Sequence, residues 1–359
     1  MPVPTRSVPL TSTPHDLSPP DAGSDLVVLH SLRRSSTPGS TYTDLVSGSC
    51  PPGTELKFFS WSTALRGRFD VFHMHWPEQL VRDRHRPWLR PVRASLFTLL
   101  LLRLRVRRIP LVWTVHNLAP HEPGGLIESL LFRLFRGSVA TAVTMTEATP
   151  DPGVPARTVI AHAHYREHFP REVLAERRPS SILHCGIIRP YKGVESLLAA
   201  FADLPDPAAS LRIVGKPQTP DQADLVRSGC AADPRVSAHL GYADDATFVT
   251  ELDAAQLVVL PYRGRMHNSG VLLAALSRGT PVLVPRSPVN EALAERVGHD
   301  WIVQYDGDLD ATVLASALAV TAGRTGTPDL SAHDPSTVAA RHGELYRELR
   351  GRDAGRRRP

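Results

Sequence analysis

Short, almost continuous apolar runs, each long enough for one strand, alternate with segments of helical periodicity along most of this chain. In the second half these runs are "SSILHCGII", "SLRIVGK", "VSAHLGY", "QLVVLPY", "PVLVP" and "WIVQY". They are separated by helical patterns at 193–204, 220–231, 244–254 and 268–278. Runs without polar alternation are typical of strands that are buried on both faces of a parallel sheet. The alternation therefore predicts an α/β fold built from βαβ units.

The first half repeats this pattern with the runs "DLVVLH", "LKFFSW", "DVFHMHW", "PLVWTVHN" and "VATAVTM". A chain of 359 residues is too long for one ordinary core and suits two domains. The polar stretch 170–181 separates the halves. We predict two Rossmann-like, doubly wound domains that face a cleft, with bounds at 25–170 and 180–325, followed by a C-terminal helix at 326–350.

The two ends of the chain and its overall charge narrow the functional class. Residues 1–24 are rich in Pro, Ser and Thr and lack the apolar core of a signal peptide, which predicts a disordered extension. Residues 351–359 predict a solvated basic tail. Three scattered cysteines provide no disulfide framework or zinc site, which favours the cytoplasm. The net charge of +5 favours anionic partners, but basic and aromatic residues are not interleaved as in RNA-binding domains, so nucleic acid is not expected.

Ligands of doubly wound sheets bind at the carboxyl ends of the strands, where loops and helix N-termini converge. In the second half these strand ends carry Arg189, Lys192, Gly193, Lys216 and Tyr242. Lysine is rare in this chain: only three of its 41 Lys and Arg residues are Lys. Two of those three therefore lie at strand ends of one predicted domain.

A further segment, "NSGVLLAALSRGTPV", opens a predicted helix with Asn268, Ser269 and Gly270. A polar cap followed by Gly leaves backbone N–H groups free at a helix N-terminus, which is a site for phosphate. Arg189 and Lys192 supply positive charge for a diphosphate. Taken singly, a Lys in a turn is usually solvated and an Asn-Ser pair is usually only a cap. Their convergence predicts a phosphate-binding site.

Several of these segments, in the order in which they occur, resemble a known enzyme family. The segment 186–201, "GIIRPYKGVESLLAAF", and the ordered pieces "LRIVGK", "VSAHLGYADDATFVTEL", "AQLVVLPY" and "SGVLLAALSRGTPVLVP" resemble GT-B-fold glycosyltransferases. The resemblance covers most of 26–320 and is strongest from 182 to 285. In the first half, "FHMHWPE" and "VWTVHNLAPHE" resemble bacterial members that build exopolysaccharide or glycolipid, including xanthan-type β-mannosyltransferases.

The resemblance implies an acceptor-binding first domain and a donor-binding second domain in which Arg189, Lys192 and Gly193 hold the donor diphosphate. The implied donor is a GDP- or UDP-linked sugar, and the implied acceptor is a glycan or a lipid-linked saccharide. Such an enzyme in polysaccharide biosynthesis is expected in the cytoplasm, including the inner face of the membrane.

The sequence departs from the large retaining branch of this family at two positions. That branch has two glutamates eight residues apart, and here those positions are Met266 and Ala274. The missing carboxylates favour an inverting transfer. They also leave two alternatives open: a sugar-nucleotide epimerase or hydrolase of the same fold, and a catalytically inactive nucleotide-sugar-binding or scaffold protein.

An inverting transfer needs a general base for the acceptor hydroxyl. The loops of the first half offer Glu122, His116 and Glu78, in that order of preference. His73 and His75 suggest a metal pair, but no third ligand accompanies them in the sequence, so no metal is expected. No cofactor is expected either, because the nucleotide sugar is a co-substrate.

The segment 90–108 combines leucines with many arginines. Its apolar centre, 96–102, is far shorter than the ~20 residues needed to span a bilayer. A basic amphipathic helix that lies on an anionic membrane suits this pattern and a lipid-linked acceptor. The alternative is a helix that covers the sheet with its leucines and exposes its arginines to water.

Overall fold

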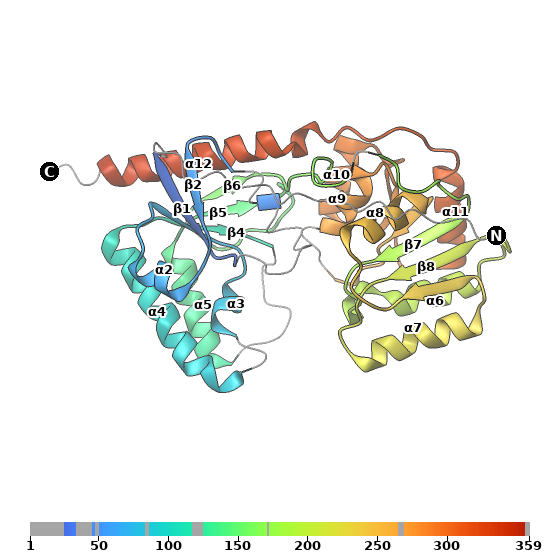
Figure 1. Cartoon of the computed structure of the whole chain (residues 1–359), viewed down its shortest axis with the longest axis horizontal. Coiled ribbons are helices and arrows are strands. Elements are labelled where there is room, and N and C mark those ends of the chain that lie inside the picture. The colour runs from blue at the N-terminus through green and yellow to red at the C-terminus, as the bar shows by residue number, and fades with distance from the viewer. Residues whose placement is uncertain are drawn as a thin grey trace, which may run out of the picture.

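The computed structural model describes residues 25–33, 45–46, 50–82, 86–116, 125–170, 172–264 and 269–355. These residues form two six-stranded parallel sheets, with strand orders β2-β1-β3-β4-β5-β6 and β12-β11-β10-β7-β8-β9. Each sheet lies in its own α/β body, and the two bodies stand side by side (Figure 1). This arrangement confirms the predicted fold of two doubly wound domains.

The first sheet takes its strands from the N-terminal half. They are β1 (Leu26–His30), β2 (Thr54–Lys57), β3 (Val71–Met74), β4 (Leu111–Thr114), β5 (Val139–Thr144) and β6 (Arg157–Val159). The helical segments between them are α2 (Trp61–Arg66), α3 (Pro77–Val81), η1 (Pro87–Leu89), α4 (Arg90–Arg107) and α5 (Leu126–Ser138). The run "LKFFSW" is only partly a strand, because Ser60 caps the start of α2 by accepting a hydrogen bond from the Thr63 backbone N–H.

The second sheet comprises β7 (Ser181–Cys185), β8 (Ser210–Val214), β9 (Val236–His239), β10 (Leu257–Val259), β11 (Val282–Pro285) and β12 (Ile302–Tyr305). Its helical segments are η2 (Pro190–Lys192), α6 (Val194–Ala202), α7 (Pro220–Ala232), α8 (Asp245–Ala254), α9 (Gly270–Ser277), α10 (Pro288–Val297) and α11 (Ala311–Thr321). β7 and β10 are neighbours near the centre of this sheet, so the loops that follow them meet.

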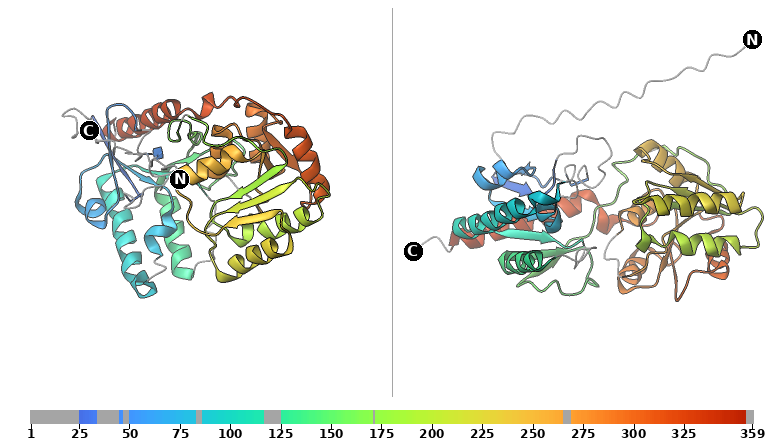
Figure 2. Two further views of the ribbon diagram at one scale, coloured as in Figure 1. Left: turned by 45° about the vertical axis from the view of Figure 1, so that its right-hand side comes forward. Right: turned by 90° about the horizontal axis from the view of Figure 1, so that it is seen from below.

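The chain returns to the first domain at its C-terminus. After η3 (Ser331–His333), helix α12 (Pro335–Gly355) runs back across the first sheet and packs against β3. Figure 2 shows this helix beside the first domain in both further views. The helix expected at 326–350 thus begins later, at Pro335, where the Asp334 carboxylate accepts a hydrogen bond from the Ser336 backbone N–H.

Both faces of the first sheet are therefore covered. On one face Phe97 of α4 and Phe135 of α5 pack with Phe72, and on the other Tyr346 of α12 packs in the same core as Val71. Successive strand residues point to opposite faces. Double coverage explains why the strands read as continuous apolar runs.

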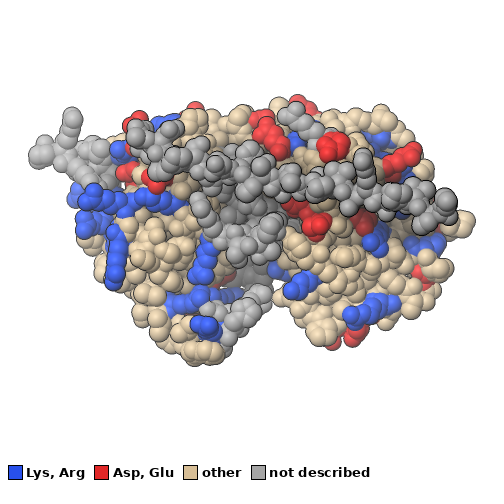
Figure 3. Space-filling model, in the orientation of Figure 1, with Lys and Arg blue, Asp and Glu red and all other residues tan. Residues whose placement is uncertain are grey.

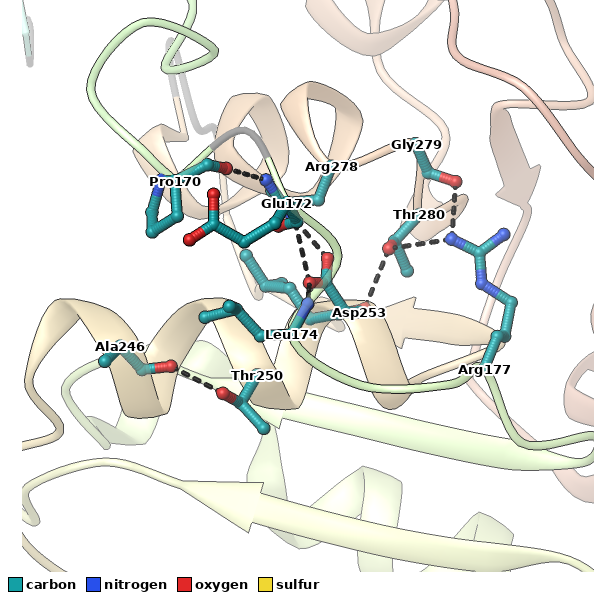
Figure 4. A network of polar contacts seen from close by, with 11 residues as sticks. Pro170, Glu172, Leu174, Arg177, Ala246, Thr250, Asp253, Arg278, Gly279 and Thr280 are labelled. Atoms are coloured by element: carbon teal, nitrogen blue, oxygen red, sulfur yellow. Dashed lines mark hydrogen bonds and ion pairs between the residues drawn. The ribbon is translucent and has the colours of Figure 1, made fainter. Parts of the chain in front are cut away.

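The polar stretch between the domains is fixed to the second domain by charged side chains (Figure 4). The buried Asp253 carboxylate accepts hydrogen bonds from the Arg278 guanidinium at 2.7 Å and from the Leu174 backbone N–H at 2.8 Å. The same guanidinium donates to the carbonyls of Pro170 and Glu172. A bidentate buried pair of this kind fixes the linker by geometry as well as by charge.

Candidate functional site

The loop after β7 is pressed against the end of β10. Gly193 lies in the left-handed region at φ 69°, and a Cβ there would lie 2.1 Å from the Pro261 carbonyl oxygen. The Arg263 backbone N–H also donates to the Tyr191 carbonyl at 2.6 Å. Only glycine meets both the conformational and the steric requirement at position 193. The loop is thereby held in one conformation with Lys192 at its end.

Lys192 points inward although lysine side chains are almost never buried without a partner. It is 9% exposed, and among the described residues its ammonium has no hydrogen bond or ion pair. Burial, with a smaller contribution from Arg189, lowers the pKa of Lys192 to about 8. A Cβ built on Gly186 would lie 3.1 Å from Lys192 Nζ and 3.2 Å from Val271 Cγ2. The ammonium is therefore next to the first turn of α9, where an anion would complete its surroundings.

The N-terminus of α9 forms the opposite side of this site. The Ser269 hydroxyl accepts a hydrogen bond from the Leu272 backbone N–H at 3.3 Å, and a Cβ on Gly270 would lie 3.0 Å from the Tyr165 hydroxyl. Asn268 lies outside the described residues, as does Met266. Ala274 is buried within α9 and presents no polar group.

The other predicted donor residues lie around this centre with less direct contact. Arg189 precedes η2 and is half-buried, and its Nε has no hydrogen-bond partner in the part of the chain described. Lys216 is exposed, but its carbonyl accepts from the Ile188 backbone N–H at 3.0 Å, so it neighbours the end of β7. Tyr242 follows the edge strand β9 and is 59% exposed. Lys192, Gly193, Ser269 and Gly270 thus come together, with Arg189 and Lys216 beside them and Tyr242 further out.

A pocket that is open to solvent lies between the domains. We call it the interdomain pocket. Its wall on the second domain includes Tyr262, Ser269 and Arg286. Met145 and His162 close it from the first-domain side. The cleft expected from two facing domains is therefore present.

A second pocket lies between the carboxyl ends of the first sheet and α12. We call it the histidine pocket, because its walls include His30, His73, His75, His162 and His342. Met145 and His162 line both pockets. The two pockets therefore adjoin at these residues.

Two buried imidazoles, His30 and His75, and the half-buried His116 form a hydrogen-bonded row that we call the histidine chain. His30 Nδ1 lies 2.9 Å from His75 Nε2, and His75 Nδ1 lies 3.3 Å from His116 Nε2. The ring centroids are 5.2 Å apart in the first pair and 5.5 Å apart in the second. Each centroid distance is longer than the N···N distance of its pair, by 2.3 Å and 2.2 Å respectively. This excess equals the two centroid-to-nitrogen distances added together, so the two centroids and the two nitrogens lie on one line. The paired nitrogens therefore point straight at each other, as in a linear hydrogen bond.

His73 supports this chain from the side. Its ring stacks on that of His75 at 4.5 Å between centroids. Its nitrogens are hydrogen-bonded to the Tyr346 hydroxyl at 2.5 Å and to the Thr114 hydroxyl at 2.7 Å. His73 is therefore a buried side chain with both ring nitrogens hydrogen-bonded.

The structure places the three candidate bases differently. His116 follows β4, stacks on Trp76 at 4.2 Å and ends the histidine chain. Glu78 lies in α3, and burial raises the pKa of its carboxyl. Glu122 lies outside the described residues. His116 and Glu78 thus remain predictions that geometry does not rank.

Sequence reasoning missed His30, His342 and Tyr346. His30 is the last residue of an apolar run and carries no motif, and its partner His75 is 45 residues away. His342 and Tyr346 are at i, i+4 on α12, whose position over the first sheet no local pattern reveals. His30 also supplies the third imidazole that was absent beside His73 and His75, since nitrogens of these three lie within 4.8 Å of one another.

Comparisons with known proteins agree with this geometry. The chain is 40% identical over 330 residues to the GDP-mannose:glycolipid 4-β-D-mannosyltransferase of Xanthomonas campestris pv. campestris, which covers 91% of this chain and 94% of that protein. No protein-family model matches the chain.

Solved structures show the same fold at low identity. HepE of Anabaena in complex with UDP-glucose matches with a TM-score of 0.60 and 13% identity over 92% of this chain and all of that one (100%). AviGT4, a glycosyltransferase involved in avilamycin A biosynthesis, matches with a TM-score of 0.56 and 15% identity over 91% of this chain and 98% of that one. The chain therefore belongs to the GT-B glycosyltransferase family that includes the Xanthomonas mannosyltransferase, and it is an enzyme that moves a sugar from a nucleotide-sugar donor to a glycan or lipid-linked acceptor.

Proposed function

We propose that this enzyme transfers mannose from GDP-mannose to a lipid-linked saccharide and forms a β-linkage. The observation that carries the proposal is the 40% identity, over 91% of the chain, to an enzyme named for that donor, a glycolipid acceptor and a β-product. GDP-mannose holds its sugar in the α configuration, so a β-product requires inversion at C1. The chain's Ala274, in place of the retaining branch's glutamate, supports the same outcome.

The second domain supplies the charge that the departing GDP needs. Among the described residues the buried ammonium of Lys192 has no hydrogen bond or ion pair, and it lies beside the first turn of α9. A diphosphate between them would receive charge-assisted hydrogen bonds from both. Arg189, Lys216, Tyr242 and Asn268 complete the proposed donor site. Donors preorganised at the leaving oxygen stabilise the charge that develops in the transition state.

We propose that no metal ion takes part in this transfer. The positive charge that a metal would bring to the diphosphate is supplied by Lys192, Arg189 and the helix N-terminus. In the histidine chain, His30 Nδ1 and His75 Nε2 face each other along one line at 2.9 Å. Metal ligands must instead aim at a common point between them. Chelation by EDTA should accordingly leave transfer unchanged.

The proposed acceptor is anchored in lipid, and α4 offers a surface for a membrane. Apolar side chains stand exposed along it, including Leu99 at 50%, Leu102 at 54% and Val106 at 70%. The exposed arginines of the same helix are Arg90, Arg105 and Arg107. Figure 3 shows basic side chains gathered on the first domain with few acidic ones among them. None of the described helices is long and apolar enough to cross a membrane. We propose that α4 lies on the inner face of an anionic membrane.

The test is transfer by the purified enzyme to lipid-linked saccharides in vesicles, with GDP-mannose, GDP-glucose and UDP-glucose compared as donors. We expect an acceptor-dependent mannosylated product whose C1–H1 coupling in the NMR spectrum identifies the β-anomer. Retained α configuration would contradict inversion. Turnover of GDP-mannose without acceptor would support an epimerase or hydrolase, and binding without turnover would support a scaffold.

A further inference from the structure

We propose that the histidine pocket receives the reacting hydroxyl of the acceptor sugar, and that His30 takes its proton and passes the charge through His75 to His116. This inference rests on the proposed function, because it names the acceptor side of the same reaction. It assigns a catalytic role to His30, which ends β1, and a proton-relay role to the histidine chain.

The first observation is the state of His30 Nε2. The His30 side chain is 4% exposed and lines the histidine pocket. Its Nδ1 is engaged by His75, whereas its Nε2 has no hydrogen-bond partner within the described ranges. A buried polar atom without a partner is costly. A sugar hydroxyl in the pocket would satisfy it.

The second observation is the position of the histidine pocket relative to the donor site. Met145 and His162 are shared by the histidine pocket and the interdomain pocket. The interdomain pocket also includes Ser269 at the N-terminus of α9, where the diphosphate is proposed to bind. Met145 and His162 therefore form a wall that the histidine pocket shares with the pocket on the donor side.

The third observation is the linear geometry of the chain. With a lone pair on His30 Nε2, the His30 Nδ1–H donates to His75 Nε2, and the His75 Nδ1–H donates to His116 Nε2. Each ring then has one proton and one acceptor nitrogen in line with the next. His73, held by Tyr346 and Thr114, stacks on His75 and keeps its ring from turning. Burial keeps all three rings of the chain neutral by lowering their pKa.

The reaction balances without any further reactant. The acceptor oxygen forms the bond to C1 of the donor sugar, and the bond from C1 to the diphosphate oxygen breaks with its electron pair leaving on GDP. The hydroxyl proton moves to His30 Nε2. His30 releases its Nδ1 proton to His75, and His75 releases its Nδ1 proton to His116 Nε2. His116 becomes an imidazolium, at the end of the chain remote from the reacting hydroxyl.

The experiment measures kcat, the acceptor KM and the dissociation constant of GDP for His30→Asn, His30→Ala and His75→Asn in the full chain. His164→Gln is the control, because His164 is 5% exposed, similar to His30, but lines neither pocket. We expect His30→Asn to lower kcat at least about a hundredfold, the contribution of a general base, with GDP binding unchanged. Added imidazole should restore turnover to His30→Ala, whose cavity it fits. His75→Asn should lower kcat less, and His164→Gln should resemble the wild type.

The outcomes separate this inference from the proposed function. If the wild type transfers mannose and both His30 variants keep kcat within threefold, the inference is wrong and the function stands. Loss of turnover that imidazole does not restore, together with a raised acceptor KM, would make His30 a structural residue and would also overturn the inference. Absence of transfer by the wild type would instead contradict the proposed function.

Discussion

At the scale of single residues, Lys192 shows why a lysine persists in a chain whose other basic residues are almost all arginine. Its ammonium lies 3.1 Å from where a Cβ of Gly186 would be, and Val271 is equally close to that point. The Tyr262 ring is 5.4 Å from the same ammonium and closes another side. A compact ammonium fits this space, whereas a planar guanidinium is larger and has five N–H donors that need acceptors.

We predict that Lys192→Ala weakens GDP binding by roughly 10- to 100-fold and leaves guanosine binding unchanged. Each charge-assisted hydrogen bond lost is worth about 1.5–3 kcal/mol, and a tenfold change in affinity corresponds to about 1.4 kcal/mol. Isothermal titration calorimetry with both ligands measures the difference. Lys57→Ala is the matched control, because Lys57 belongs to β2 of the other domain and pairs with Glu55 at 3.6 Å. An equal loss for GDP and guanosine would contradict a diphosphate role.

What the sequence could reveal at this scale depends on how local the signal is. Lys192, Gly193, Ser269 and Gly270 were predictable, because each stands at the junction of a strand or loop with a helix. His30 was not, because a histidine at the end of an apolar run is ordinary. Its role depends on His75, which only the pairing of β1 with β3 brings near.

At the scale of elements, α4 combines the two roles that its sequence suggested, a helix that covers the sheet and a helix with an exposed apolar and basic face. Phe97, Leu100 and Leu104 are buried against the sheet, so the helix does cover the core. Leu102 and Val106 nevertheless face water. Arg103 is different again, because its guanidinium donates to the carbonyls of Ala64 and Gly67 and ties α4 to α2.

The exposed face of α4 leads to a prediction about vesicles. The double variant Leu102→Glu, Val106→Glu should lose binding to vesicles that contain phosphatidylglycerol, because it removes apolar contact and adds charge repelled by anionic lipid. Co-sedimentation measures the bound fraction. Val320→Glu is the control, since Val320 is 52% exposed on α11 of the second domain. Wild-type binding by the double variant would rule out α4 as the contact.

Elements with strong local signals were predicted within about two residues. The four helices expected in the second half appear as α6, α7, α8 and α9. β6 was missed, because Arg157–Val159 is short and mostly exposed or half-buried. The docking of α12 was missed for another reason: helical periodicity gives the helix but not the surface on which it packs.

At the scale of the whole molecule, the chain passes between the two domains twice. The first passage leads from β6 to β7, and the second leads from α11 to α12. Near the first, Arg177 donates to the Gly279 carbonyl at 2.8 Å and to Thr280 at 3.3 Å, and Arg278 holds Pro170 and Glu172. His162 lies near the first passage and His333 near the second, and His333 Nδ1 lies 2.8 Å from the His162 carbonyl oxygen.

The many buried histidines predict a protein that loses stability in mild acid. Burial lowers the pKa to about 3 for His30 and His116, and to about 4 for His162, His184 and His342. The unfolded chain binds more protons than the folded one below about pH 6.5, so folding stability is complete above that pH and falls as the pH is lowered. Each buried histidine should cost about 1.4 kcal/mol per pH unit in this range.

Thermal unfolding between pH 7.5 and 5 measures this loss. His184→Gln should reduce the slope of stability against pH by about one histidine's share. His299→Gln should leave the slope unchanged, because that side chain is 62% exposed. A melting temperature that stays constant down to pH 5 would contradict the prediction.

The return of α12 to the first domain also sets the order in which the protein can be completed during its synthesis. The ribosome releases the six strands of the first sheet early, yet the hydrogen bond between His73 and Tyr346 joins residues 273 positions apart. The apolar sheet face that receives Tyr346 is therefore exposed while the entire second domain is translated. A chain that stops before Pro335 retains that uncovered face permanently, which makes premature termination products of this gene substrates for chaperones and proteases rather than partly active enzymes.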